Sequence, residues 1–588
     1  MTSEPTEPSE AHPAPFRMPE RLFAELAAGG GSPEAVAFLE RAERARRLLL
    51  LRTLLDRLAE LPTPLTPVAE AWGVFKEAAE RAPEAVDRLL LAPTTGGWIA
   101  HMLRRVHGTA TGPPLWAEAG RLNVLALTAS LRAGSDTSLT VPLTDGGLHL
   151  PGLGLLRLPH APPGQAVAQA VTRAGELTLS GPPPPGHDGA RATVTYRPAT
   201  APVRELRPDR PRSDPRSHRP VPRAVDASPW LPLRTLTHTT PAGPVALPLE
   251  DLDPYRDLDD PVPPARLDAD EAEQWQRVFD DAVAILAATG TGQGPGRMNP
   301  ADIRAVVPYG RTAATPPAPP TVAVSASSGD SFGAMLISRP ASPLALAETF
   351  VHEFQHSKLA ALLHLFPLLE DDREERYYAP WRADPRHLTG LLHGAYAFTG
   401  VAGFWRDRLA EPAHAETAAY HFALRRLQSR LVVRTLLSSA RLTAPGRRLV
   451  TGLARTLDGW LREPVGPAAL ARARTAAALH RTQWRLRNVA AAPAGPDGTL
   501  RFRPDRGFWP DTRTHAFATR PAVPRTPDEH LAADDPATAL DGYAKDLARD
   551  PADPRARSGW IVARAVLDPG HATRRALARP ELLRPDRP

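Results

Sequence analysis

Residues 350–356, Phe-Val-His-Glu-Phe-Gln-His, contain two histidines spaced for metal binding, with a glutamate beside the first. On a helix, at about 100° per residue, His352 and His356 project from nearly the same side, so both imidazoles can reach one ion. Glu353 lies on that side too, close to a water or ligand on the metal. The pattern predicts a metal site with Glu353 as a catalytic residue. The alternative is a pair of histidines packed in a core.

The absence of cysteine limits what this metal site can be. Disulfides, thiolate-bound zinc, iron–sulfur clusters and thiol catalysis are all excluded for this chain on its own. The metal must therefore be held by imidazole and carboxylate, a ligand set that suits zinc or non-haem iron(II). Two imidazoles are not sufficient, because structural and catalytic sites both need at least a third protein ligand.

His393 is the best candidate for the third ligand. The extended histidine pattern of one zinc-protease class is excluded, because leucines occupy positions 359 and 362. The glutamates of 370–375 lie in or beside a charged run that is typical of a solvated turn. His393 follows on a helix predicted over 387–408, whose small residues favour close packing against the first helix. The alternative for His393 is a buried histidine at a helix–helix contact.

Two arginines between the predicted helices could bind an organic acid. Arg382 and Arg386 lie among prolines and aromatic residues, which favour a rigid presentation of the guanidinium groups. Guanidinium groups bind carboxylates through two parallel hydrogen bonds. The alternative is that both are ordinary surface or helix-capping arginines in an Arg-rich protein.

Composition and charge narrow the class of protein. The 588 residues, 42% of them apolar, are enough for roughly two to four folded units. A net charge of +6 is small for this length, so nucleic-acid binding is not expected. The polar N-terminus has no signal-peptide core, and no run of about eighteen apolar residues occurs. We expect a cytoplasmic protein without membrane segments.

Hydrophobic periodicity predicts an α+β fold, with a mainly helical metal-binding core, a strand-rich region and Pro-rich loops. Ser342-Pro343 predicts the start of the metal-binding helix, and short apolar runs such as Leu122–Leu127 are interpreted as strands. Five regions are predicted: a disordered tail at 1–17, helices at 18–120, strands at 121–260 with an Arg/Pro-rich loop at 204–223, a catalytic helical domain at 261–485, and a Pro/Arg-rich segment with a helical hairpin at 486–588.

Four stretches resemble one known family, the HExxH-motif peptide modification proteins. They are Thr349–Leu359, Ala379–Arg386, Leu392–Phe398 and Gly403–Trp405. The family is encoded beside radical SAM/SPASM maturases in ribosomal-peptide natural-product clusters. Its members are iron(II)- and 2-oxoglutarate-dependent peptide β-hydroxylases. The resemblance covers about 320–410.

The resemblance implies roles for the residues already singled out. His352, His356 and His393 would hold Fe(II), with O2 as co-substrate, and Arg382 or Arg386 would bind the distal carboxylate of 2-oxoglutarate. Glu353 would orient a ligand or accept a proton. The substrate would be a precursor peptide, and a radical SAM/SPASM maturase is a further candidate partner. Two alternatives stay open: a Zn(II)-dependent peptidase, and a non-catalytic peptide-binding maturation partner.

Overall fold

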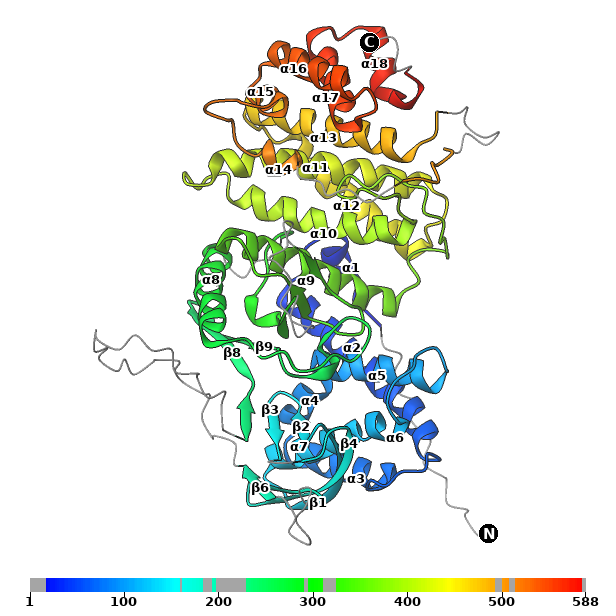
Figure 1. The fold of residues 1–588 in the computed structure, drawn as a ribbon, viewed down its shortest axis with the longest axis vertical. Helices are drawn as coiled ribbons and strands as arrows, with labels where there is room; N and C mark the ends of the chain where they lie inside the picture. Colours follow the sequence, from blue (N-terminus) through cyan, green and yellow to red (C-terminus); the bar gives the residue numbers. More distant parts are fainter. Residues whose placement is uncertain are drawn as a thin grey trace, which may run out of the picture.

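A computed structural model of the chain describes residues 17–158, 161–182, 193–196, 229–289, 294–309, 324–491, 500–506 and 513–583. The predicted Arg/Pro-rich loop at 204–223 and almost all of the predicted tail lie outside these residues. The described chain is elongated (Figure 1): N-terminal helices and a first sheet form one end, the C-terminal helices form the other, and the helix predicted to bind metal lies between them.

The N-terminal region is helical up to residue 133. Ser32 accepts a hydrogen bond from the backbone amide of Ala35 and Pro33 begins the next helix, as the sequence predicts. The helices are α1 (Glu20–Ala27), α2 (Pro33–Leu58), α3 (Val68–Arg81), α4 (Pro83–Leu91), α5 (Pro93–Val106), α6 (Leu115–Ala119) and α7 (Arg121–Ala133).

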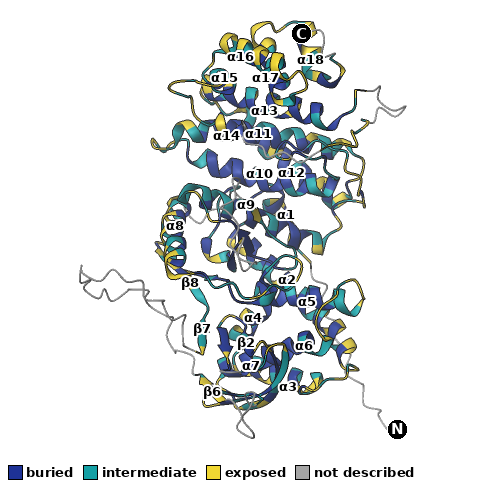
Figure 2. Cartoon of the chain, viewed as in Figure 1, coloured by how far each residue is buried: buried dark blue, intermediate teal, exposed yellow. Residues whose placement is uncertain are grey.

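Helix α7 corrects the interpretation of Leu122–Leu127 as a strand. Every residue from Arg121 to Leu131 is buried (Figure 2), because α7 lies between α3 and the first sheet. A helix buried on all sides loses the polar face that gives the 3.6-residue period, so a short apolar segment of it cannot be told from a strand.

The first sheet is antiparallel, with strand order β6-β5-β4-β1-β2-β3-β7. Its longest ladder joins β1 to β4 along the whole length of β1. The strands are β1 (Thr137–Thr144), β2 (Gly147–Leu150), β3 (Gly154–Arg157), β4 (Gln165–Arg173), β5 (Glu176–Ser180), β6 (Thr193–Tyr196) and β7 (Trp230–Pro232). One hydrophobic core joins this sheet to α3, α4, α5, α7 and the second half of α2.

The second sheet supports the helix that is predicted to bind metal. Its order is β11-β12-β10-β9-β8, with β9, β10 and β12 parallel and the two edge strands antiparallel to them. The strands are β8 (Arg234–Thr240), β9 (Gly243–Leu249), β10 (Ala305–Pro308), β11 (Ser325–Ala326) and β12 (Ala334–Ile337). Helix α8 (Ala269–Ala288) buries Trp275 and Phe279 in the core that this sheet shares with the metal-binding helix.

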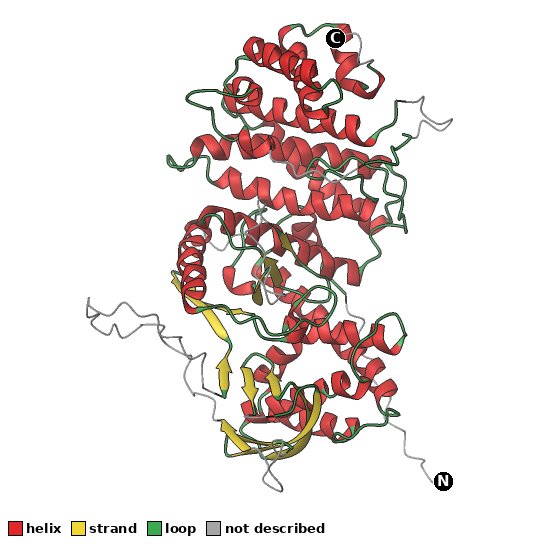
Figure 3. Ribbon diagram, viewed as in Figure 1, coloured by secondary structure: helices red, strands yellow, loops and turns green. Residues whose placement is uncertain are grey.

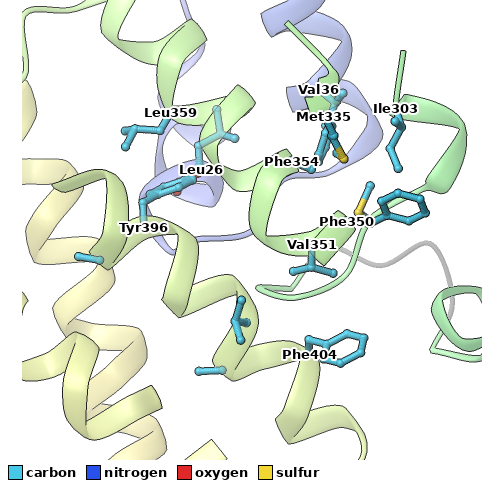
Figure 4. Packing of buried hydrophobic residues seen from close by; sticks show 14 of the residues in the cluster. Leu26, Val36, Ile303, Met335, Phe350, Val351, Phe354, Leu359, Tyr396 and Phe404 are labelled. Carbon is cyan, nitrogen blue, oxygen red and sulfur yellow. The ribbon is translucent and has the colours of Figure 1, made fainter. Parts of the chain in front are cut away.

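Two helices follow the second sheet and pack closely against each other. Helix α9 (Pro343–Leu365) starts at the predicted Ser342-Pro343 pair, and His387 caps α10 (Leu388–Asp407) through the backbone amide of Gly390. A Cβ atom on Gly400 of α10 would lie 2.4 Å from the Gln355 side chain of α9, so this contact requires glycine. Figure 4 shows the apolar side chains of both helices in the shared core.

The remaining helices stack on α10, and the whole is α+β (Figure 3), which confirms the predicted fold class. They are α11 (Ala415–Ser438), α12 (Ala444–Arg462), α13 (Pro467–Asn488), α14 (Arg513–Ala516), α15 (Pro527–Ala532), α16 (Pro536–Arg549), α17 (Pro554–Leu567) and α18 (His571–Ala578). The predicted C-terminal hairpin corresponds to α16 and α17. In the described part of the chain, no helix is long and apolar enough to cross a membrane.

The end of β9 is followed by a buried acidic cluster that yields a stability prediction. Glu250 is 5% exposed. Its burial, followed by the charge of Asp253, raises its pKa from 4.5 to about 7. The folded state therefore holds a proton that the unfolded state releases between these values, and stability falls as pH rises through that range.

We expect Glu250→Gln to raise the free energy of unfolding by about 2 kcal/mol at pH 8 and to change it little at pH 4.5. The glutamine carbonyl can keep the hydrogen bonds that Glu250 accepts from the amides of Leu252 and Asp253. Urea denaturation at both pH values checks this. An equal change at the two values would show that the charge of Glu250 is not the cause.

Candidate metal centre

The structure brings together the three histidines that the sequence singles out. His352 Nε2 lies 3.1 Å from His356 Nε2, both on α9. The other ring nitrogen of His356, Nδ1, lies 3.4 Å from Nδ1 of His393 on α10. The rings are half-buried between the two helices. The close packing of α9 and α10 at Gly400 therefore positions the third imidazole.

The distance between the Nε2 atoms of His352 and His356 is compatible with one shared metal ion. Nitrogens that each lie about 2.1 Å from an ion, at an angle of roughly 95°, are about 3.1 Å apart, which matches the pair His352 and His356. His393 lies beside this pair and faces the opposite nitrogen of His356. Accordingly, within the described residues, no three His, Asp or Glu side chains converge as a complete metal site. For His393 to be the third ligand, one of its ring nitrogens would have to lie on the Nε2 side of His356 instead of the Nδ1 side.

All three rings are held in the form that binds metal. Burial lowers the pKa of His352 to about 4, and the charge of Arg425 contributes further. Burial, followed by His352, lowers the pKa of His356 to about 3. Burial, followed by His387 and Arg386, lowers the pKa of His393 to about 4. Neutral imidazoles have a free lone pair at neutral pH, as metal ligation requires.

Glu353 adds a buried carboxyl group to the site. Its side chain is 1% exposed, and its Oε2 has no hydrogen-bond partner among the residues described. Its Oε1 lies 4.0 Å from Nε2 of His352. A buried carboxylate is costly unless a positive charge or a proton compensates it. A cation bound by His352 and His356 would supply that compensation, so the donor set fits a metal ion.

Arg382 and Arg386, the predicted organic-acid ligands, both pair with one carboxylate. Arg382 Nε donates to Asp384 Oδ1 at 3.0 Å, and Arg386 donates to Asp384 Oδ2 at 3.3 Å. The Arg382 side chain is 46% exposed. The loop that carries both arginines contacts the site at Trp381, whose ring stacks on Phe398 with ring centroids 4.7 Å apart. Phe398 in turn contacts the ring of His352 at 4.8 Å.

Arg425 of α11 is a site residue that the sequence analysis missed. Its side chain is 7% exposed, and its guanidinium carbon lies 4.5 Å from the centroid of the Phe398 ring. It donates to Gln428 Oε1 at 3.0 Å, but its Nε has no partner and no described carboxylate pairs with it. Burying an uncompensated cation costs several kcal/mol, of order 3 or more. This makes Arg425 a candidate ligand for an anion beside His352.

A glutamine fixes the position of Arg425. Gln428 accepts from Arg425 and donates to the backbone carbonyl of Pro380 at 3.1 Å. The hydrogen bonds join α11 to the loop that carries Trp381. One signal in the sequence could have identified Arg425: it lies seven residues from both Ala418 and Val432, which are buried on the same helix face.

No protein-family model matches the chain, and no curated protein matches it either. The side chains of α9, α10 and α11 are therefore the basis for assigning a function.

Proposed function

We propose that this chain is an iron(II)- and 2-oxoglutarate-dependent oxygenase that hydroxylates the β-carbon of side chains in a ribosomally synthesised precursor peptide. The observation that supports this most is the buried Arg425 guanidinium, which has no carboxylate partner in the described chain and lies against Phe398 beside His352. Such a cation favours a site that binds an organic acid next to a metal.

2-Oxoglutarate has the chemistry that this arrangement needs. Its two carboxylates lie at opposite ends of a short carbon chain, so one end can pair with Arg425 while the other lies near the histidines. Guanidinium groups bind carboxylates with paired, charge-assisted hydrogen bonds. A metal-bound water and a base, the parts of a hydrolytic zinc site, do not by themselves account for a second, buried cation. Arg425 therefore favours the oxygenase over the peptidase.

Each residue has a defined part in this proposal. His352, His356 and His393 would hold the iron, and with 2-oxoglutarate and O2 the bound iron supplies the oxidising chemistry. The overall reaction converts a peptide C–H bond, O2 and 2-oxoglutarate into C–OH, succinate and carbon dioxide. Arg425 orients the organic acid, and Glu353 balances the charge of the metal and orients its surroundings.

Two aromatic side chains have a part in the proposal, and the proposal also implies macromolecular partners. Phe398 lies against His352, and Trp381 stacks on the ring of Phe398, so the two would cover one side of the space between the histidines and Arg425. The precursor peptide is the macromolecular substrate, a radical SAM/SPASM maturase is a further partner, and the setting is cytoplasmic.

Turnover of 2-oxoglutarate tests the proposal without knowledge of the peptide. The protein, prepared without metal, is loaded anaerobically with Fe(II) or with Zn(II) and then exposed to air and 2-oxoglutarate. We expect succinate to form only with Fe(II), because oxidation needs a redox-active metal. Nuclear magnetic resonance follows both acids.

Two results would contradict the oxygenase. Cleavage of a co-expressed precursor peptide by the Zn(II) form, with no succinate from the Fe(II) form, would identify a peptidase. Peptide binding with neither reaction would identify a non-catalytic maturation partner.

A further inference from the structure

A groove lies between α1 and α12, lined by residues of both helices. Its volume is about 730 Å³. The two helices are in close contact at Gly452, where a Cβ atom would lie 2.5 Å from the carbonyl oxygen of Ala27. Three apolar residues of α1 and three arginines of α12 line it: Phe23, Ala24, Ala27, Arg447, Arg448 and Arg455.

The groove has more positive charge than its own acidic residue can neutralise. Glu20, its one lining carboxylate, pairs with Arg448, whose guanidinium lies 4.7 Å over the ring of Phe23. Arg447 and Arg455 are exposed and have no ion-pair or hydrogen-bond partner in the part of the chain that the structure describes. They are eight residues apart on α12, so they lie on one helix face.

The wall of this groove is part of the core that holds the metal centre. The Tyr396 hydroxyl of α10 donates to the Leu26 carbonyl at 2.9 Å, at the end of α1. The Gln355 side chain of α9 donates to the Gly29 carbonyl at 2.8 Å, directly after α1 (Figure 1). A segment bound in the groove would therefore lie about one helix diameter, roughly 10 Å, from the elements that carry the histidines.

We propose that the groove binds an acidic, amphipathic segment of the peptide substrate, separate from the residue that is hydroxylated. The identity of this peptide as the substrate rests on the proposed function. Apolar side chains of the segment would contact the exposed Ala24 and the aliphatic part of Arg448, which covers the buried ring of Phe23. Its carboxylates would pair with Arg447 and Arg455. Binding through a second site holds the modified residue near the metal at a high effective concentration.

Fluorescence anisotropy with a defined probe tests the groove. The probe is a labelled synthetic amphipathic peptide with leucines on one face and glutamates on the other, and its twin has lysine at each glutamate position. We expect the full-length protein to bind the glutamate peptide and not the lysine peptide. Arg447→Glu with Arg455→Glu should weaken binding about tenfold or more, since each pair becomes a repulsion.

A matched control separates the groove from the general charge of the protein. Arg434→Glu with Arg462→Glu makes the same change of charge at two exposed arginines outside the groove and should leave binding within about twofold. Ala24→Trp fills the groove without a change of charge and should also weaken binding. Equal losses in the two double variants, or unchanged binding in Ala24→Trp, would contradict the proposal.

The experiment is independent of the chemistry at the metal centre, because it is done without iron and without 2-oxoglutarate. His352→Ala should bind the probe as the wild type does. A protein that binds the probe in the groove but forms no succinate would overturn the proposed function alone. A protein that forms succinate but does not bind the probe would overturn only the groove.

Discussion

Replacing His352 or His356 with alanine is expected to abolish iron binding and to lower 2-oxoglutarate turnover by at least about 10³-fold. The two Nε2 atoms, 3.1 Å apart, are the part of the centre already spaced for one ion. Loss of either histidine removes this spaced pair and leaves at most one other imidazole beside His393. Iron content after anaerobic reconstitution and desalting measures the effect directly.

His393→Ala tests the third ligand separately. We expect it, too, to lose stoichiometric iron, because two imidazoles do not complete a protein metal site. His364→Ala is the matched control: it lies on the same helix, and its ring pairs with Glu43 at 2.6 Å instead. If His393→Ala retains iron as His364→Ala does, His393 is a buried contact histidine and not a ligand.

Arg425→Gln is expected to raise the KM for 2-oxoglutarate roughly 10- to 100-fold, the range given by loss of a charge-assisted hydrogen bond to an anion. The helix should remain folded, since the change removes a buried cation that no described carboxylate balances. Saturation-transfer nuclear magnetic resonance gives a second measure, the binding of 2-oxoglutarate itself. Arg425→Lys should recover part of the affinity, because it keeps the charge but not the paired hydrogen bonds.

Arg382→Gln and Arg386→Gln are the matching variants for the arginines predicted from sequence. Both side chains pair with Asp384, so we expect their effects on the KM to stay below those of Arg425→Gln. The opposite order, with Arg386→Gln the most damaging, would assign the organic acid to that loop and contradict the role of Arg425.

Local sequence rules predict the helices of this centre well. Ser342-Pro343 places a cap and a proline at the start of α9, and that start determines which face His352 and His356 share. Small residues in α10 predict its close approach to α9, and Gly400 shows why: the Gln355 side chain leaves no room for a Cβ. The position of His393 beside His356 follows from this helix packing, and its role as a ligand stays a prediction.

Tertiary contacts explain what the sequence does not reveal. Arg425 lies 32 residues after His393, on another helix. Its role as a candidate anion ligand is inferred from its contact with Phe398 and from the absence of a carboxylate partner among the described residues. Helix α7 was misread as a strand because complete burial removes its amphipathic period. In both cases the deciding fact is which elements surround a residue, and local periodicity does not encode it.

The central claim is that a ribosomally synthesised precursor peptide is the substrate, and the mass of such a peptide after co-expression with this chain tests that claim most directly. The proposed function predicts that the peptide gains one oxygen atom on a β-carbon, that this atom derives from labelled O2, and that His352→Ala leaves the peptide unchanged. A truncated peptide, or one whose mass is the same with the wild type and with His352→Ala, would contradict it.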